Sequence, residues 1–358
     1  MHTSHDLDTI TPTAEAVAQA LGILTASGQF KTLRIVQPPH YLGNFTGKSK
    51  EHDIVAVVDC EATSGDPETA CPIELGATKL AVHRASGKVV AYLESLSMLE
   101  DPGVPSLPGA QAVHGIAPEA LAGKKFDSEA VQKFLWGVDY VVAHNAGYDR
   151  PVLSRRFPVF DALRWVCSMR EVNWAGRGCS SRALEYLLFK ACLTHNAHRA
   201  LADAEALAAL LSYEFPATGT NGPGAAHNAN AFMELGAMAY SHGYQVIAVG
   251  AEFDAKDIMK ARGYRWNSGD GTDGTFKAKA WSSPVVYSEQ DLDTEIKWLA
   301  ANAYQKRNWF KSDLPVAQTT ARTRHTLAQS RIALNNGQKI QLGLFMERQN
   351  SPQQACLV

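Results

Sequence analysis

The sequence predicts an α/β protein built on a mixed β-sheet, followed by a smaller α+β unit. Three observations favour this fold class. Apolar, β-branched runs come first along the chain, helical patterns then alternate with strands, and a stretch rich in glycine and proline interrupts the pattern. The chain has 358 residues, which is enough for two or three domains and a large core.

The predicted strands come in a clear order. DIVAVVDCE (53–61) is typical of a strand buried on both faces, and PIELGATKLAV and KVVAYLESL continue the sheet. YVVAH (140–144) adds a further strand. Helices are expected at 128–136, 147–156, 181–192 and 199–213. Together these elements predict one α/β domain over residues 51–215.

The flanking segments have a different character. Residues 1–50 are expected to form a helical appendage, with its helix at 13–27, and a linker. A Gly/Pro/Asn-rich linker (216–229) then precedes a small α+β accessory domain at 230–304. From residue 305 to residue 350 the chain has eight Lys/Arg against two Asp/Glu, so residues 305–358 are predicted to be a flexible, basic tail.

Composition excludes some classes of protein and leaves others open. No apolar run is long enough to span a membrane, and the N-terminus lacks the features of a secretion signal, so we expect a cytoplasmic protein without a membrane partner. The six cysteines are scattered, which suits reduced thiols. The formal net charge of −2 gives no general argument for nucleic-acid binding. It does not exclude such binding, because enzymes that act on phosphodiesters use metals and local patches.

Acidic residues occur at three places where the pattern predicts burial. Asp59 and Glu61 are two apart at the end of a buried strand, so both side chains lie on one face. Asp149 lies three and four residues before Val152 and Leu153, which places it on the apolar face of its helix. Asp203 lies in a leucine stripe. Three ordinary alternatives remain open: solvated acids past a strand end, an acid that complements a helix dipole, and a buried acid paired with arginine.

Divalent cations explain all three placements at once. Oxygen ligands of this kind suit Mg²⁺ or Mn²⁺, and two such ions stabilise both the attacking and the leaving oxygens of a phosphoryl displacement. His198 lies five residues before Asp203, at or before the helix start, and could take a proton from water. A zinc pattern formed by Cys179, Cys192, His195 and His198 is the weaker alternative, because the usual close cysteine pair is missing.

The segments DCEATSG, HNAGYD and HRALAD resemble, in this order, the three motifs of the DEDDh 3′–5′ exonucleases, a family that includes the proofreading epsilon subunit of bacterial replicative DNA polymerase. PIELGATKL and VHGI are also similar to family segments. The resemblance covers roughly residues 53–213. It implies a ribonuclease-H-like fold, with a five-stranded mixed sheet flanked by helices. It also implies a metal-activated water as the nucleophile and nucleoside monophosphates as products.

The resemblance also implies roles for individual residues. Two Mg²⁺ or Mn²⁺ ions would be bound by Asp59, Glu61, Asp149 and Asp203, with His198 as the general base. Thr63 and Asn145 would lie near the terminal nucleotide, and His114 near the substrate strand. Tyr148 is expected to serve core packing. The substrate would be a single-stranded or frayed DNA 3′ end, in replication or repair, with a DNA polymerase as a possible partner.

Outside the exonuclease-like region, two segments suggest binding. Basic and aromatic side chains alternate in the accessory domain, where they either contact nucleic acid or fill a small core beneath solvated cations: Lys256, Lys260, Arg262, Tyr264, Arg265, Trp266, Lys277, Lys279 and Trp281. QLGLF (341–345) is an apolar island in the tail that resembles the bacterial sliding-clamp-binding motif. The resemblance implies that Leu344 and Phe345 enter a pocket on the clamp beside Leu342, with Gln341 at its rim; the alternative is docking onto the protein itself.

Two other functions remain open from the sequence. The same chemistry could act on RNA, since recognition of the 2′-hydroxyl depends on the shape of the pocket. A non-catalytic scaffold that holds the clamp and nucleic acid together is the third hypothesis, and the intact set of four acids and His198 argues against it.

Overall fold

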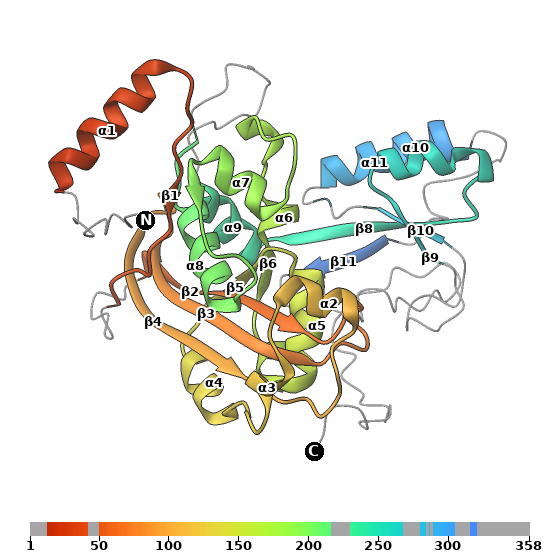
Figure 1. The fold of residues 1–358 in the computed structure, drawn as a ribbon. Helices are drawn as coiled ribbons and strands as arrows, with labels where there is room; N and C mark the ends of the chain where they lie inside the picture. Colours follow the sequence, from red (N-terminus) through yellow and green to blue (C-terminus); the bar gives the residue numbers. More distant parts are fainter. Residues whose placement is uncertain are drawn as a thin grey trace, which may run out of the picture.

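The computed structural model describes residues 13–41, 50–215, 230–267, 280–283, 286, 289–304 and 316–320. Its principal sheet has five strands in the order β4-β3-β2-β5-β6 (Figure 1). These are β2 (His52–Ala62), β3 (Pro72–His83), β4 (Val89–Leu99), β5 (Tyr140–Ala143) and β6 (Trp165–Cys167). The mixed sheet predicted from the sequence is therefore confirmed, including its flanking helices.

Strand β2 is the central strand of this sheet. It pairs antiparallel with β3 along its whole length and parallel with β5 at Val55–Val57. Strand β3 pairs antiparallel with β4, and β5 pairs parallel with β6. Every residue from Ile54 to Val58 is buried, which explains why the sequence shows a continuous apolar run rather than an alternating one.

Helices cover both faces of the sheet and divide its core in two. One apolar cluster contains residues of α4 (Ser128–Leu135) and α5 (Ala146–Arg156), packed on Ala56 and Val58. The other contains residues of α7 (Leu184–Lys190), α8 (Ala200–Leu211) and α9 (Ala231–Tyr240), packed on Val55 and Val57. The alternation of side chains along β2 thus supplies both cores.

The remaining elements of this region are short. Helix α2 (Pro108–His114) and helix α3 (Pro118–Leu121) follow β4. Short elements connect the later strands and helices: the helical turns η1 (Pro158–Ala162), α6 (Ser168–Glu171) and η2 (Ala175–Arg177), and the two-residue strand β7 (Leu193–Thr194). Strand β7 ends just before the loop that leads into α8. This loop carries part of the candidate site.

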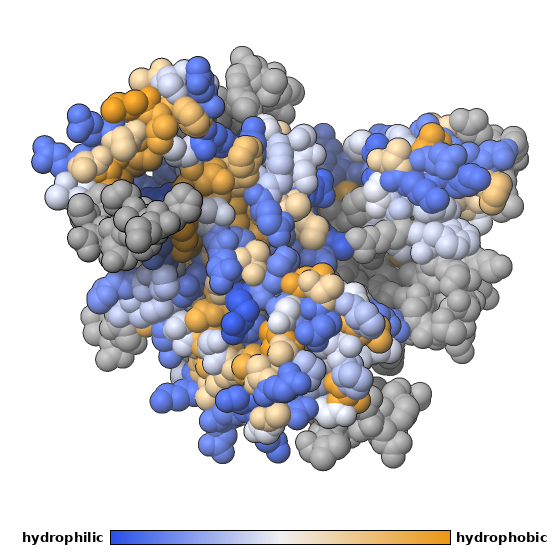
Figure 2. Space-filling model, viewed as in Figure 1, coloured by the Kyte–Doolittle hydropathy of each residue, from blue (hydrophilic) through white to orange (hydrophobic). Residues whose placement is uncertain are grey.

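The N-terminal segment contains the predicted helix, followed by a short strand that pairs with the rest of the chain. Helix α1 (Ala14–Ser27) begins at the cap Thr13 and has no buried residue, and Figure 2 shows apolar side chains along it. Strand β1 (Arg34–Ile35) pairs parallel with β7. Further on, the Tyr41 hydroxyl donates to Glu205 Oε1 at 2.7 Å, which ties the segment to α8.

Helix α9 lies on the principal sheet, although the sequence suggested that it opens the accessory domain. The Asn230 side chain caps α9 and donates to the Gly87 carbonyl at 2.7 Å, and the Tyr240 hydroxyl donates to Asp53 Oδ1 at 2.7 Å. The helix is thus bonded to the sheet at both ends. The Gly/Pro-rich break at 216–229 therefore does not mark the end of the first core, and the predicted domain limits remain predictions.

A second sheet has the strand order β11-β8-β10-β9. It contains β8 (His242–Val249), β9 (Arg265–Asn267), β10 (Ala280–Ser282) and β11 (Val316–Thr320), with helices η3 (Phe253–Ala255), α10 (Lys256–Ala261) and α11 (Glu289–Ala303) nearby in sequence. Strand β11 differs from the prediction of a flexible tail at 316–320. Its valine and threonines favour a strand, and β8 offers an edge for pairing.

The aromatic and basic residues of this second unit have mainly structural contacts. Tyr264 and Trp281 are buried, and Arg262 forms a bidentate pair with Glu295. Trp266 is exposed while it packs on the Trp281 ring. These contacts favour core packing over nucleic-acid binding for Tyr264, Trp281 and Arg262.

Two further expectations can be compared with the structure. Among the described residues, no helix combines the length and apolar character needed to cross a bilayer. Cys60, Cys167, Cys179 and Cys192 are free thiols, as expected, whereas Cys71 takes part in a disulfide bond and departs from that expectation.

Candidate active site

The candidate site begins at the end of β2, where the strand delivers two carboxylates to one face of the sheet. Asp59 and Glu61 are half-buried and lie opposite Gly76 and Glu74 of β3. The pairing shifts between Glu61 and Ala62, so the regular ladder ends directly after the second acid. The two-residue spacing predicted their shared face correctly.

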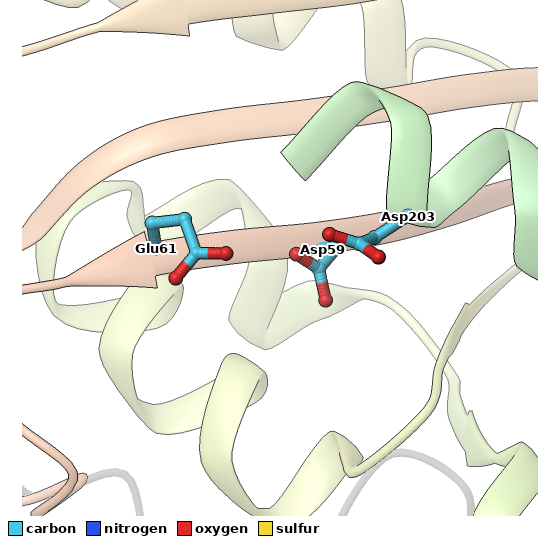
Figure 3. A group of neighbouring side chains, drawn as sticks. All are labelled: Asp59, Glu61 and Asp203. Atoms are coloured by element: carbon cyan, nitrogen blue, oxygen red, sulfur yellow. The ribbon is translucent and has the colours of Figure 1, made fainter. Parts of the chain in front are cut away.

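Asp203 brings a third carboxylate to the same place. It is buried in the first turn of α8 and projects towards Asp59, while Glu61 turns its carboxylate in the same direction (Figure 3). One oxygen from each of the three groups lies within 4.8 Å of the others. The structure therefore gathers a strand end and a helix start around one point, as the sequence predicted for these three acids.

Gly76 makes the close approach of α8 possible. A Cβ atom at this position would lie 2.0 Å from the Ala200 carbonyl carbon and 2.0 Å from the Leu201 nitrogen. Real Cβ contacts of this length do not occur, so only glycine allows the first turn of α8 to rest directly on β3. Since Gly76 is the partner of Asp59 in the ladder, the contact lies at the site itself.

Asp149 adjoins the three acids from the other side of β2. It lies in the first turn of α5 and is buried, and its Oδ1 atom accepts hydrogen bonds from the Cys60 amide at 3.2 Å and the Cys60 thiol at 3.5 Å. It is not a member of the 4.8 Å group. Its charge nevertheless reaches that group, because after burial it is the largest cause of the raised Asp59 pKa.

The electrostatics of the site disfavour negative charge. Burial raises the pKa of the Glu61 carboxyl to about 7, and the carboxylates of Asp203 and Glu74 add to this effect. Burial also raises the Asp149 pKa to about 7, although hydrogen bonds to Cys60 oppose the shift. The Asp59 pKa is raised as well, through burial and neighbouring acids. Such a cluster is stabilised by bound cations.

Glu74 is a fifth acid at the site that the sequence analysis did not single out. It is buried on β3, and its carboxylate accepts from the Arg199 guanidinium at 2.9 Å and from the Ala200 amide at 3.2 Å. It therefore caps α8 and compensates one charge with Arg199. A glutamate inside the otherwise apolar PIELGA was the signal that could have revealed it.

Two histidines lie in the turn between β7 and α8, and only one was given a role from the sequence. His198 is exposed and has a backbone φ of 65°, in the left-handed region that few residues other than glycine adopt, although histidine, asparagine and aspartate do so more often than the rest. His195 has a buried ring whose Nε2 atom lies 2.5 Å from Asp203 Oδ1. The sequence gave His195 no role beyond the zinc alternative.

The residues expected near the substrate have the following surroundings. Thr63 is buried, its Oγ1 atom accepts from the Cys71 amide, and its carbonyl accepts from the Leu107 amide at 2.8 Å. Asn145 precedes α5 and is half-buried. His114 ends α2 and is buried; its Nδ1 atom accepts from the Ile116 amide at 3.0 Å. Burial lowers the His114 pKa.

Other sequence predictions have different outcomes. Tyr148 packs against the core, as expected, and its hydroxyl also donates to the Ser64 carbonyl at 2.5 Å. The zinc alternative is not supported, because among the described residues the group of metal-ligand side chains is Asp59, Glu61 and Asp203. Gln341, Leu342, Leu344 and Phe345 lie outside the described residues.

The donor set fits a hard divalent cation. All three members of the 4.8 Å group offer carboxylate oxygens, which are the ligands that Mg²⁺ and Mn²⁺ prefer, and no thiol or imidazole belongs to the group. Raised carboxyl pKa values are the expected property of such a site without its cation. These residues can therefore hold a metal ion.

Known exonucleases are similar to part of this chain. The chain is 33% identical over 152 residues to Exodeoxyribonuclease 10 of Escherichia coli K12; the match covers 41% of this chain and 64% of that protein, less than two thirds of its length. A solved structure of Exonuclease X in complex with 5′ overhanging duplex DNA has 27% identity and a TM-score of 0.35, covering 44% of this chain and 89% of that one.

Weaker similarity extends to a second exonuclease. The structure of E. coli Exonuclease I in complex with a dT13 oligonucleotide has 18% identity and a TM-score of 0.35, covering 44% of this chain and 40% of that one. The family model RNase_T, described as Exonuclease, matches residues 56–211. This segment contains all five acids described above together with His195 and His198. The similarity to the RNase_T model is thus confined to residues 56–211, which are less than half of the chain.

Proposed function

We propose that this protein is a metal-dependent 3′–5′ exonuclease that hydrolyses DNA from its 3′ ends and releases nucleoside monophosphates. The observation that carries the proposal is the gathering of Asp59, Glu61 and Asp203 within 4.8 Å, with Asp149 next to them. Burying so many acids together is unfavourable without compensating cations. Two Mg²⁺ or Mn²⁺ ions would supply that compensation.

The residues of the site are proposed to have different roles in metal binding and proton transfer. When bound, the ions would polarise the scissile phosphate and favour deprotonation of the attacking water. Asp59 and Glu61 would hold them from β2, Asp203 from α8 and Asp149 from α5. His198 would accept the proton of the attacking water, since its exposed ring sits in the turn that leads into the Asp203 helix.

His114 supports a contact with the substrate strand. Because its Nδ1 atom accepts a hydrogen bond from Ile116, the proton belongs on Nε2. That buried Nε2 atom has no hydrogen-bond partner in the described part of the protein. A phosphate oxygen of the substrate would satisfy it. Thr63 and Asn145 are proposed to line the place of the terminal nucleotide, from the end of β2 and the start of α5.

DNA is the proposed substrate rather than RNA. The support is the similarity to a protein named as an exodeoxyribonuclease, together with the clamp-like segment in the tail. A replication or repair role follows from the same two observations. The part of the predicted accessory domain that follows α9, at 242–304, and the tail would serve partner contacts, with a DNA polymerase as a possible partner, in the cytoplasm.

A gel assay tests the activity directly. Single-stranded DNA and RNA of equal sequence, labelled at the 5′ end, are incubated with the protein in Mg²⁺, in Mn²⁺ and in EDTA, beside the Asp203→Ala variant. We expect a ladder of shortened DNA that needs metal and that the variant does not produce. A ladder with RNA alone would overturn the DNA assignment, and no ladder on either would favour the non-catalytic scaffold.

The tail proposal has its own test. Residues 341–345 are proposed to bind a bacterial sliding clamp, which would raise the local concentration of the enzyme at replicating DNA. Deleting them should abolish capture by immobilised clamp while leaving hydrolysis of short oligonucleotides unchanged. Capture that survives the deletion would contradict the assignment.

A further inference from the structure

His195 lies where it can control a metal ligand. It directly follows β7, and its ring, of which 5% of the side chain is exposed, places Nε2 at 2.5 Å from Asp203 Oδ1. The other oxygen, Oδ2, accepts from the Arg199 amide at 3.1 Å. The loop between β7 and α8 therefore binds both oxygens of the Asp203 carboxylate.

These two hydrogen bonds fix the orientation of the carboxylate without using all of its lone pairs. A carboxylate offers about four lone-pair sites on its two oxygens. Two are taken by His195 and Arg199, which leaves about one on each oxygen for a cation. Because Asp203 projects towards Asp59 (Figure 3), the remaining lone pairs are available to the three-acid group. Hydrogen-bonded carboxylates of this kind are typical of metal sites.

The N-terminal segment holds the base of this loop. Strand β1 pairs with β7 in parallel, with Arg34 opposite Leu193 and Ile35 opposite Thr194. The Val36 amide donates to the Thr194 carbonyl at 2.8 Å, at the residue immediately before His195. The backbone that carries the imidazole is thus fixed from outside the exonuclease domain.

We propose that His195 is a positioning residue, which orients Asp203 for cation binding by donating a hydrogen bond from Nε2 to Oδ1. The proposal rests on the metal-dependent function proposed above. His195 itself contacts neither the substrate nor the cation. Its effect is expected on metal affinity and on turnover, with no effect on DNA affinity.

Three substitutions in the full-length protein test this role. In His195→Gln the side-chain amide can place an N–H close to the position of Nε2, in His195→Asn the amide is too short to reach it, and His195→Leu has no donor. His83 offers matched controls, because its ring bonds to Ser86 in the hairpin between β3 and β4. The measurements are Mn²⁺ affinity by calorimetry, the melting temperature, and kcat and KM on single-stranded DNA.

We expect His195→Leu and His195→Asn to lower Mn²⁺ affinity and kcat by about 10- to 100-fold, the range typical of lost partners of metal ligands, with KM unchanged. In His195→Gln, Mn²⁺ affinity and kcat should return to within about threefold of the wild type. The His83→Gln and His83→Leu controls should match the wild type in both quantities. If His195→Leu does not fold, the comparison of Gln with Asn decides.

Three outcomes would overturn the inference. Equal Mn²⁺ affinity in the Gln and Asn variants would show that the hydrogen bond does not position Asp203. Tighter binding in the Leu variant would mean that His195 competes with the cation. A wild-type protein that binds no Mn²⁺ would overturn the proposed function and this inference together, whereas the first two outcomes leave the proposed function intact.

Discussion

Replacing Gly76 by alanine should separate α8 from the sheet and dismantle the metal site. The new Cβ atom would meet backbone atoms of Ala200 and Leu201 at 2.0 Å, whereas ordinary contact begins at 3.4 Å. Backbone cannot rotate away as a side chain does, so the helix start must withdraw by about 1.4 Å. Asp203, one turn into that helix, would move with it.

The magnitude follows from this displacement. Overpacking a core costs about 1–3 kcal/mol, and contact with backbone places Gly76→Ala near the upper value. For a domain of this size about 3 kcal/mol lowers the melting temperature by roughly 6–12 °C. Since Mg²⁺ holds its ligands at about 2.1 Å in a nearly ideal octahedron, a shift of about 1.4 Å removes Asp203 from shared coordination. We expect Mn²⁺ affinity to fall by at least about tenfold.

Calorimetry with and without Mn²⁺ measures both effects. Gly147→Ala is the matched control, because its Cβ atom would only touch Arg170 at 3.8 Å. That variant should stay within about 1 kcal/mol of the wild type. A Gly76→Ala protein with the melting temperature and Mn²⁺ affinity of the wild type would refute the close approach of α8 to β3.

Three further predictions follow from the site and its surroundings. The folded pKa values of Glu61 and Asp149, about 7, lie above the unfolded values of about 4, so the folded state binds more protons than the unfolded state. The melting temperature of the metal-free protein should therefore fall from pH 5 to pH 8, and Mn²⁺ should restore it most at pH 8. A metal-free melting temperature that rises with pH would contradict this. Glu74→Gln loses the charged pair with half-exposed Arg199 and should cost about 1–3 kcal/mol in urea unfolding; an unchanged midpoint would speak against the pair. Asn230→Ala removes the α9 cap and should cost about 1–2 kcal/mol in the same unfolding transition as the principal sheet; loss in a separate transition would place α9 in another unit.

Local periodicity was sufficient to predict the strands and the three acids that meet. Asp59 and Glu61 share a face because strand side chains alternate, and Asp203 faces inward because it lies within a leucine stripe. Such patterns depend on residues close in sequence. They can therefore be recognised without knowledge of the fold.

Features that depend on distant pairing were missed. His195 is placed by β7, which has only two residues and pairs with β1 more than 150 positions earlier. Helix α9 looked like the start of a new domain because its contacts with Gly87 and Asp53 are invisible after a Gly/Pro-rich break. Strand β11 has five residues in a polar segment, too short to stand out against a predicted tail.

The double pairing of β2 has a consequence for how the protein opens. Amides of a central strand that is bonded on both sides exchange with solvent only when the whole domain unfolds. The turn that contains His198 has no such ladder and can open by itself. In hydrogen–deuterium exchange, residues 55–57 should therefore be among the slowest and residues 196–199 among the faster ones. The strand that carries two of the acids would then be anchored in the most durable part of the molecule, whereas the proposed proton acceptor belongs to a part that exchanges on a much shorter timescale.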